Sequence, residues 1–354
     1  MTGYSFSKVF NDKSGWYCGD FHVHTNASSD GDYPPTVVAE LARAEGLDFV
    51  TITDHNTISG FSEIDEDLDF PIIPGIEITL DKGHFNVFGI GERHQWIEDI
   101  GDSSKTAQLP SFYPTVTELM RKTAQVGLLN SINHPRLHPW DWRYLDTDLR
   151  YVHCVELWND LYWPENTFAN PKTVDLWTTW LNAGYRVTAI GGSDYHYPPK
   201  TNQGLPGERL GQPTTFVYAE QLSAAAILEG LRQRRVYVSK GPRVAVQAEM
   251  NNTSYKIGDD LGEQAGDIEV TASISHGPDH IHAQLVRNGE IIANEHLSGP
   301  ETSVQFRDQV DPTRPAWYRF EVLDRNWEAL AITNPIFVNS HEKDIPITQG
   351  SSLK

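Results

Sequence analysis

Histidine and acidic side chains recur along this chain at the ends of short apolar segments. Two pairs are spaced two residues apart: GDFHVHT contains His22 and His24, and GGSDYH contains Asp194 and His196. In a β-strand, residues i and i+2 point to the same face, so each pair offers two ligating atoms to one metal ion. Imidazole together with carboxylate suits zinc, iron or manganese better than calcium. The sequence therefore predicts a polynuclear metal site with nine ligands: His22, His24, Asp30, His55, Glu77, His84, His134, Asp194 and His196.

Three of the single candidates have an informative local context. His55 follows Asp54 at a strand end, and we expect Asp54 to orient an imidazole. Glu77 follows a Pro-Gly turn in an apolar strand, where an ionised carboxylate needs a partner such as bridged metal ions. His134 precedes Pro135, which favours an extended backbone at the histidine.

Two further candidates have local competitors. Asp30 precedes glycine, and Asp-Gly is also a plain turn signal. His84 competes with Asn86 for the same position, and we prefer the imidazole. The HxH pair at His280 and His282 lies far in sequence from any acidic cluster and is assigned a structural role. The same assignment covers His94, His138, His153, His276, His296 and His341.

Short apolar segments alternate with helical ones over the first two-thirds of the chain, which favours βα units and a parallel sheet. Strands are predicted at residues 16–23, 49–53, 72–78, 85–90, 128–132, 152–157, 186–190 and 214–218. Helices are predicted at residues 35–45, 115–126, 173–182 and 222–234. The candidate ligands fall at or just beyond the carboxyl ends of the strands, where catalytic groups converge in α/β barrels.

The pattern changes near Gly241–Pro242, and residues 244–338 read as alternating strands separated by turns. The Asn288-Gly289 pair is a two-residue hairpin signal. These features predict a C-terminal β-sandwich. The predicted organisation is a metallohydrolase barrel over 1–241, a β-sandwich domain over 242–340 and a polar tail over 341–354.

The chain has 354 residues with 28 basic and 48 acidic side chains, a net charge of −20 that opposes binding to a nucleic-acid duplex. Cys18 and Cys154 are too few for a disulfide framework. The N-terminal residues lack a secretion signal, and no apolar run approaches the length of about 20 residues that spans a membrane. We expect a cytoplasmic protein with no membrane partner.

The motifs occur in a fixed order over roughly residues 15–240: HxHT, TDHNT, PGxE, a histidine before proline, and SDxH. This order resembles the PHP (polymerase and histidinol phosphatase) superfamily. The resemblance implies a distorted seven-stranded (β/α) barrel with two or three divalent metal ions, zinc, manganese or iron. It implies one metal held by His22, His24, Glu77 and Asp194, a second by Glu77, His134 and His84, and a third by Asp30, His55 and His196.

One position departs from that pattern, because many family members have HxxG where this chain has His84-Phe-Asn-Val-Phe-Gly89. The GHFN sequence and the β-domain that follows a Gly-Pro pair are similar to the carbaryl-hydrolase-like branch (CehA/McbA type) of these hydrolases.

The expected function is that of a metal-dependent phosphoesterase acting on a small phosphorylated substrate. Two metals bridged by a carboxylate can share a water, lower its pKa and present it as hydroxide. Glu77 and Asp194 are predicted to serve catalysis through the metals, and Arg136 to clamp a phosphoryl oxygen. For Arg136 a plain surface position has equal weight, and leaving-group protonation falls to a metal-bound water or His138.

Two alternatives remain. The hydroxide could attack a carbamate or carboxylic ester, with the aromatic segments at 140–144 and 156–166 forming an apolar pocket, although packing explains them slightly better. The chain could instead be a non-catalytic binding module, with Trp317 or Trp327 of the sandwich binding carbohydrate, although core packing is the commoner role of such aromatic residues.

Overall fold

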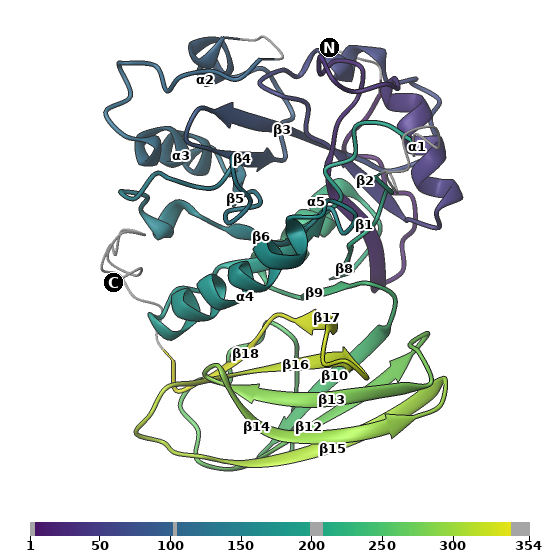
Figure 1. Cartoon of the computed structure of the whole chain (residues 1–354), viewed down its shortest axis with the longest axis vertical. Coiled ribbons are helices and arrows are strands. Elements are labelled where there is room, and N and C mark those ends of the chain that lie inside the picture. The colour runs from purple at the N-terminus through teal and green to yellow at the C-terminus, as the bar shows by residue number, and fades with distance from the viewer. Residues whose placement is uncertain (1–3, 102–104, 199–207, 341–354) are drawn as a thin grey trace.

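The computed structural model describes residues 4–101, 105–198 and 208–340, so the predicted tail at 341–354 lies outside the described residues. Its helices are α1 (Pro35–Ala44), α2 (Gln95–Ile100), α3 (Val116–Gln125), α4 (Asn166–Asn182) and α5 (Ala224–Arg232), with 3₁₀ turns η1 (Ser59–Glu63) and η2 (Leu149–Tyr151). In Figure 1, α1, α2 and α3 lie in the upper part of the molecule, α4 crosses its middle, and the lower part consists of strands.

The first nine strands are β1 (Gly15–Val23), β2 (Phe49–Ile52), β3 (Ile72–Leu80), β4 (Gly83–Phe88), β5 (Leu129–Ile132), β6 (Cys154–Asn159), β7 (Thr188–Gly192), β8 (Thr214–Ala219) and β9 (Val236–Ser239). Strands β1 to β7 lie in the sheet in the order in which they occur in the chain. β1, β2 and β3 are parallel, as are β5, β6 and β7.

The expectation of a parallel sheet is wrong at β8, which is antiparallel to β1, and at β4, which is antiparallel to both β3 and β5. Only Asp81 and Lys82 separate β3 from β4. A two-residue link can join antiparallel strands, whereas parallel neighbours need a crossover of a dozen or more residues. The short link therefore determines the direction of β4.

The two ends of this seven-strand series meet. Val23 at the end of β1 forms a parallel bridge with Tyr195, just beyond β7. The backbone N–H of His24 donates to the Tyr195 carbonyl at 2.8 Å, and the Ser193 N–H donates to the Asp20 carboxylate at 3.0 Å. The sheet curls until the first and last predicted ligand pairs lie side by side.

The predicted helix at 173–182 begins earlier than expected, because α4 starts at Asn166 and contains Pro171. Proline removes a helical hydrogen bond, so the sequence pattern placed the helix start after it. Trp177 and Trp180 of α4 are fully buried, and burial of such large side chains contributes about 2–3 kcal/mol each. Packing of this face outweighs the unfavourable proline.

The remaining strands are β10 (Arg243–Met250), β11 (Thr253–Lys256), β12 (Gly266–Ser275), β13 (His280–Arg287), β14 (Glu290–Ser298), β15 (Glu301–Val310), β16 (Ala316–Asp324), β17 (Ala329–Thr333) and β18 (Ile336–Val338). They form two sheets. One has the order β11-β10-β12-β15, and β10 alternates exposed and buried residues as a half-buried strand should.

The other C-terminal strands extend the large sheet in the order β14-β13-β16-β17-β9-β8-β1. The pairing of β17 with β9 therefore joins the C-terminal strands to the α/β part through backbone hydrogen bonds. The hairpin signal is confirmed: Asn288 and Gly289 link β13 to β14, and both have the positive φ that the tight hairpin turn requires. Of the two tryptophans considered for carbohydrate binding, Trp317 is buried and its indole N–H donates to Asn182 of α4.

Within the part of the chain that the structure describes, no helix is long and apolar enough to cross a membrane.

Candidate metal centre

The ligand pairs at the ends of β1 and β7 point toward each other. The Nε2 atoms of His22 and His24 each lie 3.1 Å from Oδ1 of Asp194. Both imidazoles are completely buried. The i, i+2 spacing in β1 places the two rings on one face of the strand, and the bridge between β1 and the segment after β7 brings Asp194 to them.

Glu77 of β3 is the central carboxylate of the cluster. Its Oε1 lies 3.3 Å from His22 Nε2 and 3.2 Å from His84 Nδ1. Its Oε2 lies 2.5 Å from His55 Nδ1 and 3.9 Å from His24 Nε2. A carboxylate whose two oxygens face different sets of imidazoles can bridge two metal ions.

His84 of β4, rather than Asn86, faces this carboxylate. The Asn86 side chain instead donates to the Phe21 carbonyl and accepts from Asn133. His134, beyond β5, completes this side of the cluster with its Nε2 3.6 Å from Glu77 Oε1.

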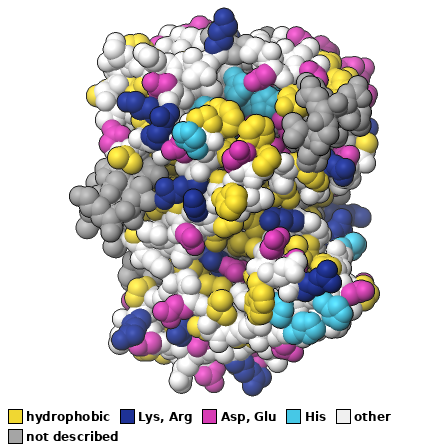
Figure 2. Space-filling model, viewed as in Figure 1, with side chains coloured by type: hydrophobic (Ala, Val, Ile, Leu, Met, Phe, Trp, Pro, Cys, Tyr) yellow, Lys and Arg dark blue, Asp and Glu magenta, His cyan; other side chains and the backbone are white. Residues whose placement is uncertain are grey.

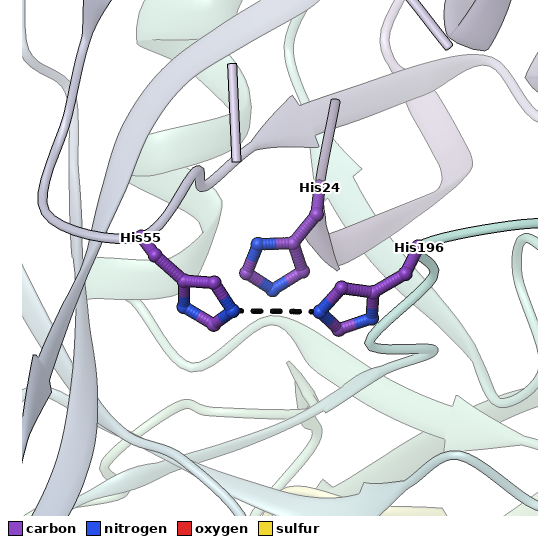
Figure 3. A group of neighbouring side chains, drawn as sticks. All are labelled: His24, His55 and His196. Atoms are coloured by element: carbon purple, nitrogen blue, oxygen red, sulfur yellow. Dashed lines mark hydrogen bonds between the residues drawn. The ribbon is translucent and has the colours of Figure 1, made fainter. Parts of the chain in front are cut away.

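A third group lies on the other side of His24 (Figure 3). The rings of His24, His55 and His196 converge, and Nε2 of His55 is 3.5 Å from Nε2 of His196. Oδ2 of Asp30 lies 3.5 Å from His55 Nε2 and 3.8 Å from His196 Nε2. Asp30 is half-exposed, in contrast to the other ligand candidates.

The nine predicted ligands thus lie in one cluster. Three groups have ligand atoms close enough to hold a metal ion: His22, His24 and Glu77; Glu77, His84 and His134; His24, His55 and His196. The groups share Glu77 and His24, so ions bound to them would be neighbours. These groups differ from the sets implied by the family resemblance, because His24 joins the third group and neither Asp30 nor Asp194 belongs to any of the three.

The chemistry of the donor atoms fits a metal. His22 Nε2 is buried and has no hydrogen-bond partner among the described residues. The other ring nitrogen, Nδ1, lies 2.9 Å from Glu156 Oε1. In His22, one ring nitrogen contacts a carboxylate and the other faces further acidic oxygens. Histidines that bind metals commonly have this arrangement.

Several residues that sequence reasoning missed orient these ligands. Glu156 of β6 contacts His22 and also accepts the His134 backbone N–H at 2.7 Å. Asn133 donates to Glu77 Oε1 and Thr79 donates to Oε2, each at 2.9 Å. A buried glutamate in the apolar sequence CVELW was the available signal for Glu156.

Asp54 acts less directly than we expected. Its carboxylate accepts from the Thr25 N–H and hydroxyl and from the Ser28 hydroxyl, and it contacts no imidazole in the hydrogen bonds described. The Ser28 hydroxyl in turn lies 3.2 Å from His24 Nδ1 and accepts the His55 N–H. Asp54 therefore positions the loop and the serine, and the serine positions the rings.

The backbone is unusual at two ligands. His134 and Asp194 have φ angles of +28° and +54°, a region that residues other than glycine adopt at a cost of about 1–3 kcal/mol. The extended backbone expected at His134 from the following proline is therefore wrong. Its N–H bond to Glu156 and its ring near Glu77 explain how this conformation is held.

The close packing around Gly192 explains why a glycine stands two residues before Asp194 in the GGSD sequence. A Cβ atom at this position would lie 2.4 Å from both Glu156 Oε1 and His22 Cβ. Only glycine allows β7 to approach His22 and its carboxylate partner so closely.

The electrostatics of the cluster depend on pairing between carboxylates and imidazoles. Burial alone would raise the pKa of Glu77, but His84, His55 and His22 outweigh it and hold the pKa well below its usual range. Burial and the nearby His196 and His55 lower the pKa of His24, which favours the neutral form that binds metals.

For His55, Glu77 and Asp30 outweigh burial and raise the pKa to about 10. Metal binding must displace the His55 proton, so metal affinity should weaken as the pH falls.

The cluster lies in a cavity of about 310 Å³. Its other walls include Leu137, Trp140, Trp163 and the carboxylates of Asp160 and Glu208. No lysine or arginine is among the described residues that line it. In Figure 2, histidine side chains gather in the upper part of the visible face, with hydrophobic side chains beside them.

Two residues with predicted roles lie elsewhere. Arg136 does not line the cavity, and the acidic residues that act on its pKa are Asp141 and Asp175. His138, a candidate proton donor, is almost fully exposed, lies 3.5 Å from Asp141 and is not part of the cavity wall.

The histidines assigned structural roles fit those roles where the structure describes them. His153 Nδ1 accepts the Asn130 backbone N–H at 3.0 Å. His282 stacks on Trp327 with ring centroids 3.9 Å apart, and it lies opposite His296 in the β13–β14 hairpin. None of these histidines belongs to a group that could hold a metal within the described part of the chain.

Comparison with known proteins gives the following similarities. Residues 20–143 match the model of the PHP domain, a segment that contains seven of the nine predicted ligands and ends before Asp194 and His196. A 5'-3' exoribonuclease of Haemophilus influenzae is 28% identical over 116 residues, covering 27% of this chain and 42% of that protein. The chain therefore spans about two-fifths of the length of this curated relative.

Among solved structures, one similar chain is a two-domain protein of Bacteroides vulgatus containing a predicted PHP-like metal-dependent phosphoesterase. The two chains are 22% identical with a TM-score of 0.50, and the match covers 94% of this chain and 98% of that one. This similarity shows a shared fold. The PHP-domain match and the ligand groups support a metal-dependent hydrolase.

Proposed function

We propose that this chain is a metal-dependent phosphoesterase that hydrolyses a small phosphorylated substrate in the cavity beside Glu77. The observation that carries the proposal is three overlapping ligand groups in a cavity lined by no described lysine or arginine. A phosphoryl group entering this cavity would meet acidic side chains, so its charge must be balanced by bound cations. The PHP-domain match over residues 20–143 supports the same reading.

The nine ligands would hold two or three divalent ions in the sets described above, with Glu77 as the bridge. When bound, such ions make water nucleophilic near neutral pH and neutralise charge on a phosphoryl oxygen. We further propose that β1 to β7 are a seven-stranded barrel of PHP type and that residues 242–340 are a separate β-sandwich domain. Placement in the carbaryl-hydrolase-like branch is part of the same proposal and rests on the GHFN sequence and the β-domain that follows the Gly-Pro pair.

The residues around the candidate ligands orient the ligand side chains. Glu156 fixes the ring of His22 through Nδ1 and the backbone of His134 through its N–H. Asn133 and Thr79 hold the two oxygens of Glu77 from opposite sides. Because these partners lie on β3, on β6 and directly after β5, the ligand atoms are positioned before any ion binds, which lowers the entropic cost of metal binding.

Asp160 is our candidate for the acid that protonates the leaving oxygen. It lines the cavity, and its Oδ1 accepts the Tyr162 N–H at 3.0 Å. Its pKa is raised to about 7, because burial and the charges of Glu208 and Asp194 together outweigh the opposing Tyr162 hydrogen bond. A carboxylic acid with this pKa carries a proton for part of the time near neutrality, as a general acid must.

A substrate screen tests the proposal. Metal-reconstituted protein should hydrolyse phosphomonoesters or phosphodiesters, and a chelator should abolish the activity. Assays with carboxylic aryl esters and carbamates test the alternative, in which the same cluster acts on a carbonyl group. Turnover of the esters or carbamates with none of any phosphoester would contradict the proposal, and turnover of no substrate class would favour a binding module.

The phosphoryl clamp predicted for Arg136 stays a prediction. Its guanidinium is half-buried, and burial lowers its pKa while Asp141 and Asp175 oppose that shift. A clamp requires Arg136→Ala to lower kcat/KM for phosphoesters about tenfold to a thousandfold, the range expected for charge-assisted hydrogen bonds. The effect on neutral aryl esters should be much smaller. Equal losses on both classes, or none, would assign Arg136 a structural role.

A further inference from the structure

The cavity has a second wall that the metal chemistry does not use. Trp140 and Trp163 both line it, and their ring centroids lie 5.9 Å apart at an interplanar angle of 69°. They are 39% and 37% exposed, respectively, so each presents indole surface to solvent beside the buried ligands. Exposed large apolar side chains that adjoin one another commonly mark a binding surface.

The loops that carry these tryptophans are tied to the site. Trp140 follows ligand His134 in a loop whose Leu137 N–H donates to the His134 carbonyl at 2.9 Å. Trp163 follows β6, and its N–H donates to the Asp160 carbonyl at 3.3 Å. Both indoles are therefore held by loops that leave the carboxyl ends of adjacent strands.

The charges around the tryptophans restrict what can bind there. The polar residues on this wall include the carboxylates of Asp160 and Glu208, and no described lysine or arginine lines the cavity. A second phosphate group or a polynucleotide backbone would be repelled at this position. A flat, uncharged ring would be accepted, because any aromatic ring can stack on an indole face or meet its edge.

We infer that Trp140 and Trp163 bind a flat aromatic ring carried on the alcohol side of the phosphoester, next to the metal ions. The substrate class is thus an aryl or nucleoside phosphate with one phosphoryl group at the metals. This inference rests on the phosphoesterase function proposed above. The volume of about 310 Å³ is at the lower end for ligand pockets and suits one small molecule.

The test compares substrates with and without a ring on metal-loaded full-length protein. Adenosine 5'-monophosphate and 4-nitrophenyl phosphate carry a ring, and ribose 5-phosphate does not. In Trp163→Leu and Trp140→Leu, kcat/KM for the ring-bearing substrates should fall about 5- to 100-fold, the range expected from loss of one stacking contact. The value for ribose 5-phosphate should change less than about twofold, because that substrate makes no stacking contact. Trp163→Phe should recover much of the loss, which separates loss of the ring from loss of the fold.

Trp327→Leu is the matched control, because Trp327 is also exposed, at 55%, and stacks on His282 of β13 away from the cavity. It should leave all three substrates unaffected. If every tryptophan variant lowers all three substrates equally, or if none changes any substrate, the inference is overturned while the phosphoesterase function stands.

Direct binding provides a readout that does not depend on turnover. Adenosine and 4-nitrophenol have no phosphoester, so calorimetry can measure their binding to wild type and to both leucine variants. Binding of either compound that is lost in the variants supports the ring site, and which compound binds identifies a nucleoside or a simpler aryl group. Binding of neither compound to wild type overturns the inference. Ring binding without any phosphoester turnover would contradict the proposed function alone.

Discussion

The carboxylate of Glu77 lies within 4 Å of five imidazoles, those of His22, His24, His55, His84 and His134. Burying this charge costs free energy unless cations or protonated imidazoles compensate for it, because the carboxylate is completely buried. Burial raises its pKa, but His84, His55, His22 and His134 hold the pKa well below the usual range, so the carboxylate is ionised when the cluster is formed. The bridging role depends on that charge.

Glu77→Gln is therefore expected to abolish turnover while the fold is kept. The amide retains the shape of the side chain but loses its negative charge, and loss of several kcal/mol of electrostatic stabilisation lowers kcat more than about a hundredfold. Steady-state kinetics on protein of known metal content checks this, with circular dichroism melting as the control for folding. Near-native activity would mean that Glu77 is not a bridge.

Asp160→Asn tests the proposed proton donor. Because the donor must be protonated, activity should decline as the pH rises through the pKa of about 7, and this decline should be absent in the variant. The loss in kcat should be about tenfold to a hundredfold for alkyl phosphates and much smaller for 4-nitrophenyl phosphate, whose leaving group needs no proton. Asp267→Asn on β12 is an exposed control. Equal losses for both substrates, or an unchanged pH profile, would remove Asp160 from this role.

At the scale of elements, the parallel neighbours β5 and β6 are held together near His153, which precedes β6. Its N–H and Nδ1 both bond Asn130 of β5, and burial lowers its pKa to about 4, with Arg232 adding to the shift. The unfolded chain takes up a proton near pH 6.5, whereas the folded chain resists it until about 4. The stability contribution is therefore full above about pH 6.5 and is lost as the pH falls toward 4.

His153→Asn keeps an acceptor for the Asn130 N–H but cannot titrate. Between pH 7 and pH 5, the free energy of unfolding of wild type should fall by about 2 kcal/mol more than that of the variant. Urea unfolding of both proteins at the two pH values, each with chelator so that metal release does not differ, measures this. Parallel losses in the two proteins would contradict the assignment.

A site residue could be predicted from the sequence when the pattern that identifies it lies within a few neighbouring residues. His22 and His24 could be predicted as a pair because the i, i+2 rule is a property of one strand. The preference for His84 over Asn86 as a metal ligand stays a prediction, and the contact of His84 with Glu77 is consistent with it. Glu156 was missed because it acts through His22, 134 residues away in the chain, and no local pattern encodes that contact. Arg136 was placed near the substrate from its proximity to His134 in sequence, and this role stays a prediction because Arg136 is not among the described residues that line the cavity.

The element predictions failed where a short link or tertiary packing decides the structure. The reversal at β4 comes from a two-residue turn, and the early start of α4 comes from buried tryptophans beyond Pro171. The hairpin at Asn288-Gly289 could be predicted, because its turn chemistry is contained in the two residues themselves.

At the scale of the whole molecule, one sheet runs from the C-terminal strands through β17, β9 and β8 into β1. The same fold extends over 94% of this chain and 98% of the two-domain protein of Bacteroides vulgatus. The candidate ligands come from β1, β3 and β4 and from the segments after β1, β2, β5 and β7, and none of the three ligand groups includes a residue of the C-terminal strands among the described residues. The net charge of −20 is partly offset if the cluster binds two or three divalent ions.

The metal content of the full-length protein tests the central claim most directly. Elemental analysis after reconstitution should return at least two equivalents of zinc, manganese and iron combined, because three ligand groups share Glu77 and His24. The double variant His280→Ala and His282→Ala should bind the same amount, since these residues lie on β13 outside the cluster. Less than one equivalent in wild type, with no gain on reconstitution, would contradict the polynuclear site and the hydrolase mechanism that depends on it.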